Sequence, residues 1–257
     1  MGILNTTPDS FSDGGLFLDA ERAIAHGVAM AEQGAHILDV GGESTRPGAQ
    51  PVSVQQELDR VIPVIEGLRE RVAVPLSVDT SKPEVMRAAV AAGAGMINDV
   101  MALRAEGALE AAAELGVPVC LMHMQGEPRT MQKDPRYGDV VGEVRAFLRS
   151  RIEACTAAGI PPGNLVIDPG FGFGKTVEHN LELLRRLREF QALGPPLLVG
   201  LSRKSLIGRI LGRPVEQRLP ASLALALMAV QNGAHILRVH DVAATVDAVR
   251  LYEATYH

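Results

Sequence analysis

The amino-acid sequence predicts an α/β protein, a single-domain (β/α)8 TIM barrel over residues 1–257. Three observations support this fold class. Eight short apolar runs are spread over the chain, with helix-like segments between them. The runs do not alternate with polar residues, which is typical of parallel strands covered on both faces. The motif GAHILDV (34–40) returns as GAHILRV (233–239), as repeated strand–helix units require. A doubly wound open sheet is the alternative fold.

Several of the predicted strands follow one pattern, in which a glycine precedes four to six mostly apolar residues and a polar residue ends the run. The glycine fits the left-handed residue that ends a helix, as after ERAIAHGVAMAEQ or PEVMRAAVAA. The first strand is short and starts at the second residue, so we expect a further upstream segment in a barrel of this kind. The strands are predicted near residues 2–4, 36–40, 75–79, 95–98, 118–122, 165–168, 197–200 and 235–239.

Composition and charge exclude several classes of protein. The chain is 47% hydrophobic and 21% charged, as in ordinary globular domains. Its net charge of −5 and lack of a basic run argue against nucleic-acid binding. No apolar stretch reaches the roughly 20 residues of a membrane span, and no signal peptide is seen. Cys120 and Cys155 are expected in the core, and without a disulfide framework a cytoplasmic setting is predicted.

Polar residues follow the apolar runs, at the strand ends where a TIM barrel carries its active site. Aspartate and asparagine suit the edge of a flat heterocycle, and cationic side chains suit phosphate oxygens. Burying such charges without a ligand role would be costly. His123 could serve either packing or function. The residues expected to converge on one mouth are Asn5, Asp79, Asn98, Asp168, Lys204, Arg238 and His240.

The stretch DPGFGFGKT (168–176) resembles a phosphate-binding loop but fails on spacing. A P-loop requires glycine where the chain has Pro169, and the dinucleotide fingerprint requires glycine or alanine where it has Lys175. An ATPase is therefore disfavoured. The glycines instead let the chain turn away from Asp168, and Phe171 and Phe173 are expected to line the space beside it.

Two loops, TTPDSFSDGG and ESTRPGA, are long and rich in glycine, proline and hydroxyl residues. Both are predicted to cover the mouth of the barrel. Neither a set of histidines or carboxylates at zinc-ligand spacing nor a GxSxG motif is found in the sequence, which argues against a protein-caged zinc and a serine hydrolase.

The motifs GILNTTPDSFSDGG, DVGGESTRPGA, SVDTSKPEV, INDV, LMHMQGEPRTMQ, DPGFGFGKT, VGLSRKSLIG and GAHILRVHDV follow one another along essentially the whole chain. In this order they resemble the dihydropteroate synthases, pterin-binding TIM-barrel enzymes of bacterial folate synthesis. The resemblance implies a transferase that condenses 6-hydroxymethyl-7,8-dihydropterin pyrophosphate with p-aminobenzoate to give 7,8-dihydropteroate and pyrophosphate. It also implies a homodimer, for which the apolar helix ASLALALMAVQ is a candidate interface; burial against the barrel is the alternative.

The resemblance also implies roles for individual residues. Asp168 would accept hydrogen bonds from the pterin N3–H and 2-amino group, and Mg²⁺ would be the cofactor, with Asn5 as its ligand. The other pterin-pocket residues implied are Asp79, Asn98, Phe173 and Lys204. The pyrophosphate residues implied are Asn5, Arg238 and His240.

The implied reaction loses pyrophosphate first, in an SN1-like step, and the amine attacks the resulting methylene cation. Asp13 would stabilise this cation and accept the amine proton. Phe11 and Pro47 would sandwich the aminobenzoate ring, and Ser205 would bind its carboxylate. Thr45 and Arg46 would contact substrate from the second loop. The implied catalytic residues are Asp13, Lys204, Arg238 and His240.

Two relatives of the same fold remain as alternatives. A pterin-dependent methyltransferase domain, working with a corrinoid partner, would share the pterin pocket but would not need the two covering loops. A non-catalytic pterin-binding relative would usually have lost Lys204, Arg238 or His240, and all three are present.

Overall fold

The computed structural model describes residues 1–6, 15–44, 50–126 and 130–256, with the side chains of residues 15–18 excepted. Eight parallel strands occur in this part of the chain, in the order of the sequence. They are β1 (Gly2–Asn5), β2 (Leu38–Gly41), β3 (Leu76–Asp79), β4 (Met96–Asp99), β5 (Val119–Met122), β6 (Leu165–Asp168), β7 (Leu198–Val199) and β8 (Ile236–Leu237). Every predicted strand is found, within two residues of its predicted start.

The strands close into a barrel. Strands β1 to β6 form one hydrogen-bonded sheet, and β7 and β8 form a second. Two parallel bridges join them, Ile167 with Leu197 and Gly2 with Val239. At the second seam the Ile3 amide donates to the Val239 carbonyl at 2.9 Å. The predicted TIM barrel is therefore confirmed, and the doubly wound open sheet is wrong because β8 returns to β1.

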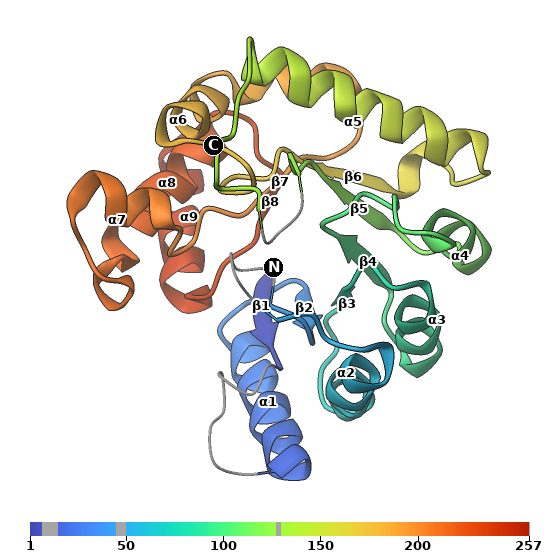
Figure 1. Cartoon of the computed structure of the whole chain (residues 1–257). Helices are drawn as coiled ribbons and strands as arrows, with labels where there is room; N and C mark the ends of the chain where they lie inside the picture. Colours follow the sequence, from blue (N-terminus) through green and yellow to red (C-terminus); the bar gives the residue numbers. More distant parts are fainter. Residues whose placement is uncertain (7–14, 45–49, 127–129, 257) are drawn as a thin grey trace.

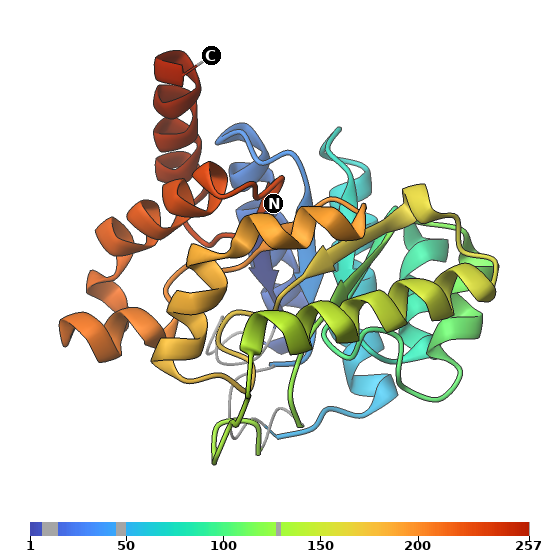
Figure 2. The same cartoon turned by 90° about the horizontal axis from the view of Figure 1, so that it is seen from above.

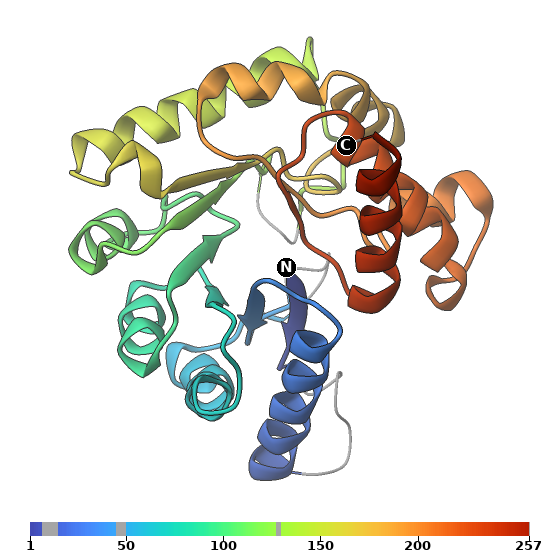
Figure 3. The same ribbon diagram turned by 180° about the vertical axis from the view of Figure 1, so that it is seen from behind.

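Helices surround the strands on the outside (Figures 1 and 3). One helix follows each strand, except that α7 and α8 both follow β7. The α-helices are α1 (Gly15–Glu32), α2 (Val54–Arg69), α3 (Pro83–Ala92), α4 (Ala108–Leu115), α5 (Val140–Ala157), α6 (Val177–Arg185), α7 (Ser205–Leu211), α8 (Leu219–Gln231) and α9 (Val242–Tyr256). Short 3₁₀ helices are η2 (Pro162–Asn164), η3 (Leu187–Leu193) and η4 (Val215–Gln217).

The main hydrophobic core lies between the strands and these helices. Both cysteines are buried and free, as the sequence predicts. None of the described helices is both long enough and apolar enough to span a bilayer. The cytoplasmic setting stays a prediction.

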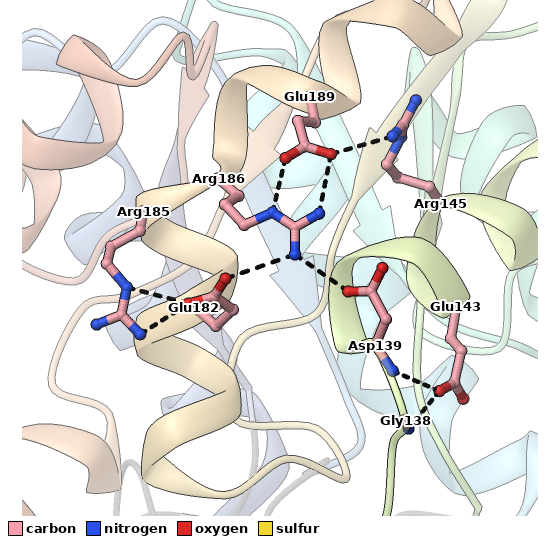
Figure 4. A network of polar contacts seen from close by, with 8 residues as sticks. All are labelled: Gly138, Asp139, Glu143, Arg145, Glu182, Arg185, Arg186 and Glu189. Carbon is pink, nitrogen blue, oxygen red and sulfur yellow. Dashed lines mark hydrogen bonds and ion pairs between the residues drawn. The ribbon is translucent and has the colours of Figure 1, made fainter.

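A polar network joins α5 to the segment that contains α6 and η3 (Figure 4). Arg186 contacts Glu189 at 2.6 Å, Asp139 at 3.1 Å and Glu182 at 3.5 Å. Arg145 of α5 also reaches Glu189, at 3.1 Å. These side chains are partly exposed, so water weakens each pair and the network mainly fixes how the two helices lie.

Candidate active site

The barrel interior changes from apolar to polar from one layer of side chains to the next. A cluster of Met96, Cys120, Val166 and Leu198 packs with Met1, Ile37 and Ile236. Alternate residues of a strand point to the same side. The residues two positions beyond Ile37, Met96, Val166 and Ile236 are Asp39, Asn98, Asp168 and Arg238. An apolar floor therefore underlies a polar mouth at the carboxyl ends of the strands.

Arg238 lies between two carboxylates of this mouth. Its Nε donates to Asp39 Oδ2 at 2.6 Å and its Nη2 to Asp79 Oδ2 at 2.7 Å. Asn98 donates to the same oxygen of Asp39 at 2.9 Å. Burial opposes the charge of Arg238, but the two carboxylates outweigh it and raise the pKa of the guanidinium. Burial raises the pKa of Asp79 to about 7, although Arg238 opposes this shift. These four residues from four strands therefore form one connected group.

Asp39 is a site residue that the sequence analysis missed. It is fully buried, and its Oδ1 has no hydrogen-bond partner among the described residues. A signal for it was present, because Asp39 and Arg238 occupy the same position in the repeats GAHILDV and GAHILRV. In a barrel whose first and last strands are neighbours, equivalent positions of β2 and β8 point into the same interior. The opposite charges at that position could have predicted the pair.

Asp168 lies in the mouth at the end of β6. Its Oδ1 accepts a hydrogen bond from the Gly170 amide at 2.7 Å, and within the described residues this is the only hydrogen bond that the carboxylate makes. Burial raises the pKa of Asp168, while the Gly170 amide and the ammonium groups of Lys204 and Lys175 oppose the shift. One carboxylate oxygen is therefore held by the turn, and the other is left for a ligand.

Lys204 and Phe173 lie beside Asp168. The Lys204 ammonium is 4.4 Å from the centre of the Phe173 ring, a cation–π contact. Burial lowers the pKa of Lys204 to about 8, and Asp168 acts in the opposite direction. The prediction for Phe171 is wrong, because this ring is buried in the core with residues of α5 and α6. In DPGFGFGKT one phenylalanine thus faces the core and the other lies by the site.

His240 follows β8 and contacts Ser202, which follows β7. The Ser202 hydroxyl is 3.0 Å from His240 Nδ1 and accepts from the His240 amide at 3.2 Å. With its oxygen accepting that amide, the hydroxyl can donate its proton to Nδ1, and we assign the ring proton to Nε2 on this basis. Burial and then Arg238 lower the pKa of His240 to about 4. His240 is therefore neutral at neutral pH.

Of the remaining predicted site residues, the structure describes Asn5 and Ser205 only. Asn5 ends β1, half-buried, and its side chain makes no hydrogen bond to another described residue. Ser205 is the exposed first residue of α7. Phe11, Asp13, Thr45, Arg46 and Pro47 lie outside the described residues. Among the residues that are described, no group of three or more His, Cys, Asp or Glu side chains could hold a metal ion.

Lys82 joins the stem of the second covering loop to the barrel. Its ammonium contacts Glu57, which is fully buried on α2, and contacts Glu43 at 2.5 Å. Glu43 also accepts from the Val52 amide at 3.2 Å, so the residues on both sides of the undescribed segment 45–49 are tied together. Burial opposes the charge of Lys82, but its hydrogen bonds to Glu43 and Glu57 raise the pKa.

We expect Lys82→Met to lower the free energy of unfolding by about 2 kcal/mol, because it leaves the buried Glu57 carboxylate without its cation. Removing one partner of a buried pair costs roughly 3–5 kcal/mol, and the partial exposure of Lys82 reduces this. Urea unfolding at neutral pH measures the change. Arg87→Met, which breaks an exposed pair between Arg87 of α3 and Glu114 of α4, is the matched control; equal losses in the two variants would contradict the assignment.

The closed barrel and the polar side chains at its strand ends define a (β/α)8-barrel protein with a small-molecule site in its mouth. Comparison with known proteins shows its family. The family described as "pterin binding enzyme" matches residues 1–240. The chain belongs to this family.

Characterised relatives and solved structures agree with this assignment. The chain is 57% identical to the dihydropteroate synthase of Escherichia coli K12 over 255 residues, which cover 99% of this chain and 90% of the relative. It resembles the Xanthomonas albilineans dihydropteroate synthase solved with 4-aminobenzoic acid, at 60% identity and a TM-score of 0.94. The same enzyme in complex with 7,8-dihydropteroate gives 57% identity and a TM-score of 0.91. Both matches cover 99% of this chain and 92% of the other.

Proposed function

We propose that the chain is a dihydropteroate synthase, which condenses 6-hydroxymethyl-7,8-dihydropterin pyrophosphate with p-aminobenzoate to give 7,8-dihydropteroate and pyrophosphate. The observation that carries the proposal is the polar mouth above an apolar floor, in a chain that matches dihydropteroate synthases over 99% of its length. The relatives' structures contain one substrate and the product of this reaction.

The pterin ring fits beside Asp168. A carboxylate with one free oxygen can accept from the N3–H and 2-amino group of a pterin, while the Gly170 amide keeps its other oxygen in place. Asn98 provides an amide at the end of β4, which β5 separates from β6. Phe173 and the ammonium of Lys204 supply an apolar face and a cation. We assign the pterin pocket to these four residues, with Asp79 at its edge.

The pyrophosphate is assigned to the opposite side of the mouth. Two of the Arg238 nitrogens are engaged by Asp39 and Asp79, so only Nη1 is without a hydrogen bond among the described residues. His240, neutral with its proton on Nε2, can donate one hydrogen bond to a phosphate oxygen. Arg238 therefore acts on the pyrophosphate mainly through its fixed positive charge and not through a bidentate pair of hydrogen bonds.

The residues present fit Mg²⁺ in a limited way. Asn5 offers a neutral oxygen that no described residue occupies, and Mg²⁺ is commonly held by one or two protein oxygens with substrate phosphates and water. When bound with pyrophosphate the ion would neutralise charge on the leaving group. The protein's part is to hold Asn5 at the end of β1, next to Gly41 of β2.

We propose the order of bond changes that the resemblance to dihydropteroate synthases implies. The pterin-CH₂–O bond to pyrophosphate breaks as Arg238 and the His240 Nε2–H stabilise the departing oxygens. The amine of p-aminobenzoate then attacks the methylene carbon and loses a proton. We propose that Asp13 accepts this proton, that Phe11, Thr45, Arg46 and Pro47 hold the aminobenzoate ring, and that Ser205 meets its carboxylate.

The test of the proposed function is an assay of pyrophosphate release. Release should require both the dihydropterin pyrophosphate and p-aminobenzoate, with formation of 7,8-dihydropteroate in equal amount. Pyrophosphate release without p-aminobenzoate, or release that ATP alone supports, would contradict the proposal. Pterin binding without turnover would instead favour a non-catalytic relative.

We also propose that the chain forms a homodimer through α7, α8 and α9, which lie next to one another on one side (Figures 1 and 2). Helix α8 buries Ser222, Ala226 and Ala229 against the barrel and exposes Met228. One face of this helix is therefore buried against the barrel, and the other face is free for the proposed interface. The large exposed apolar side chains of this side are Ile210, Leu211, Val215, Met228, Leu251 and Tyr256.

The double variant Met228→Glu with Leu251→Glu is expected to shift the protein from dimer to monomer, because it buries two carboxylates in an apolar contact. Sedimentation velocity at micromolar concentration measures the change. Ala157→Glu, on an exposed position of α5, should leave the dimer intact. A wild-type protein that sediments as a monomer at every concentration would rule the interface out.

A further inference from the structure

Lys175 is a buried lysine that the proposed reaction does not use. It belongs to the Gly-Lys-Thr sequence that resembles a phosphate-binding loop, but its side chain is only 1% exposed. Its Nζ lies 2.9 Å from the Gly170 carbonyl, 3.0 Å from the Phe173 carbonyl and 3.0 Å from Nδ1 of His123. The amine is therefore buried in the protein and does not face solvent, where a phosphate group would bind.

Four acceptors lie within 3.5 Å of this amine and none of them is a carboxylate; the fourth, the His123 carbonyl, is the most distant at 3.5 Å. An ammonium group has three donors, and two carbonyls with one ring nitrogen satisfy all three. Burial lowers the pKa of His123 to about 2, so the ring is neutral and Nδ1 can accept. His123 also packs edge-on against Phe147, with ring centres 4.9 Å apart. Of the two roles considered for His123, packing and function, the structure shows packing: the ring is buried and also accepts a hydrogen bond from Lys175.

The carbonyls that bind Lys175 belong to the turn that carries the pterin pocket. Gly170 has a φ of 71°, and a Cβ added to it would lie 1.9 Å from the His123 carbonyl oxygen. The turn is therefore packed backbone against backbone on the end of β5. Gly170 uses both of its polar groups, since its carbonyl accepts from Lys175 and its amide donates to Asp168. Lys175 is one residue away from the Asp168 carboxylate in this chain of hydrogen bonds.

We propose that Lys175 is a positioning residue for the pterin site, whose ammonium group holds the turn from Gly170 to Phe173 so that Asp168 and Phe173 face the substrate. This inference rests on the proposed function, because it takes Asp168 as the pterin ligand. The Lys175 ammonium group occupies this cage of main-chain carbonyls as a bound metal cation would, and so holds the turn in place.

The same ammonium group acts on Asp168 through its charge. Lys175 and Lys204 both oppose the rise that burial causes in the pKa of Asp168. Removing one of these cations lets Asp168 take up a proton at higher pH. A protonated Asp168 cannot accept two hydrogen bonds from the pterin edge. The acidic limb of the pH profile for pterin binding should therefore move to higher pH in a variant without the charge.

The variant Lys175→Met tests this role, because methionine keeps the length of the side chain and removes the charge and the donors. We expect the KM for the dihydropterin pyrophosphate to rise on the order of 10- to 100-fold, as for lost hydrogen bonds of a charged group. The KM for p-aminobenzoate should change by less than about twofold, and Lys175→Arg should recover part of the loss. Lys133→Met, at an exposed lysine, is the control.

An equal rise in both KM values, or an acidic limb that stays at its wild-type pH, would overturn the inference. If Lys175→Met does not fold, the wild-type protein still provides a test. Burial lowers the pKa of Lys175 to about 7, so its ¹⁵Nζ resonance can be titrated with and without 7,8-dihydropteroate. The groups that face it are His123, Asp168 and Lys204.

Binding and protonation are reciprocal, so a pterin that prefers the charged cage must raise the pKa of Lys175. An unchanged pKa on saturation with 7,8-dihydropteroate overturns the inference. A wild-type protein that does not bind 7,8-dihydropteroate at all contradicts the proposed function instead. The two failures are therefore distinguishable.

Discussion

Replacing Asp168 with asparagine is expected to lower kcat/KM for the dihydropterin pyrophosphate by about 10³-fold, as expected when a site loses a charge-assisted pair of hydrogen bonds. Asparagine keeps the size of the side chain and an oxygen for the Gly170 amide. It presents an amide where the pterin edge needs two acceptors. Steady-state kinetics with each substrate varied in turn, and calorimetric titration with 7,8-dihydropteroate, measure the effect.

The same substitution should make the protein more stable at neutral pH. Burial raises the pKa of Asp168 above its unfolded value, so the folded state favours the protonated carboxyl. Stability then falls as the pH rises above the unfolded value of about 4, where the unfolded chain ionises more readily. Asparagine removes this cost, so Asp168→Asn should gain stability over the wild type above about pH 4 and match it below.

Asp99→Asn is the control for both measurements. Burial raises the pKa of Asp99 as it does that of Asp168, but both Asp99 oxygens accept main-chain hydrogen bonds, from the amides of Met101 and Leu103 at 2.8 and 2.7 Å, and an asparagine can replace only one of these acceptors. We expect this variant to lose stability and to keep its KM for the pterin. An Asp168→Asn enzyme that binds the pterin as tightly as the wild type would disprove the pocket.

The variant Arg238→Met should lower the free energy of unfolding by about 3–5 kcal/mol, because it leaves the buried carboxylates of Asp39 and Asp79 without their shared cation. Turnover should fall as well, since the same guanidinium is assigned to the leaving group. Urea unfolding at pH 7.5 measures the stability. Arg203→Met, which breaks the more exposed pair with Asp241, should cost less.

A double variant separates the charge from the packing of Arg238. If the loss comes from the stranded carboxylate, Asp39→Asn in the Arg238→Met background should restore part of the stability, since close charges are not independent. Additive losses in the two variants would show that Arg238 stabilises the barrel by its bulk alone.

The sequence predicted the strands well because each is an apolar run that the barrel covers on both sides. Composition and spacing alone are enough for that, and the repeated motif at residues 34–40 and 233–239 showed that the units are equivalent. The positions of Asp79, Asn98 and Asp168 followed from the rule that strand ends meet at one mouth. The sequence of a single segment does not show which strands pair to close the barrel. The pairing of β8 with β1 and that of β6 with β7 depend on all the strands together.

The contacts between side chains of different strands in the mouth could not be predicted from the sequence in the same way. Arg238 and Asp39 are 199 residues apart, and only the register of the closed barrel brings them together. The neutral state of His240 depends on burial and on Arg238, which sequence does not report. The inward turn of Lys175 depends on carbonyls placed by three glycines of positive φ, Gly170, Gly172 and Gly174. Sequence patterns give positions along a strand, whereas these effects arise between strands.

The seam between β1 and β8 also has a consequence for how the chain is made. The Gly2–Val239 bridge and the Arg238–Asp39 pair both need residues from the two ends of the chain. During synthesis, Asp39 and Asp79 emerge from the ribosome long before the arginine that neutralises them. Until the last strand is in place, the barrel interior holds two acids with no counter-charge. Barrel closure and completion of the site are thus one event, which waits for the segment that carries Arg238.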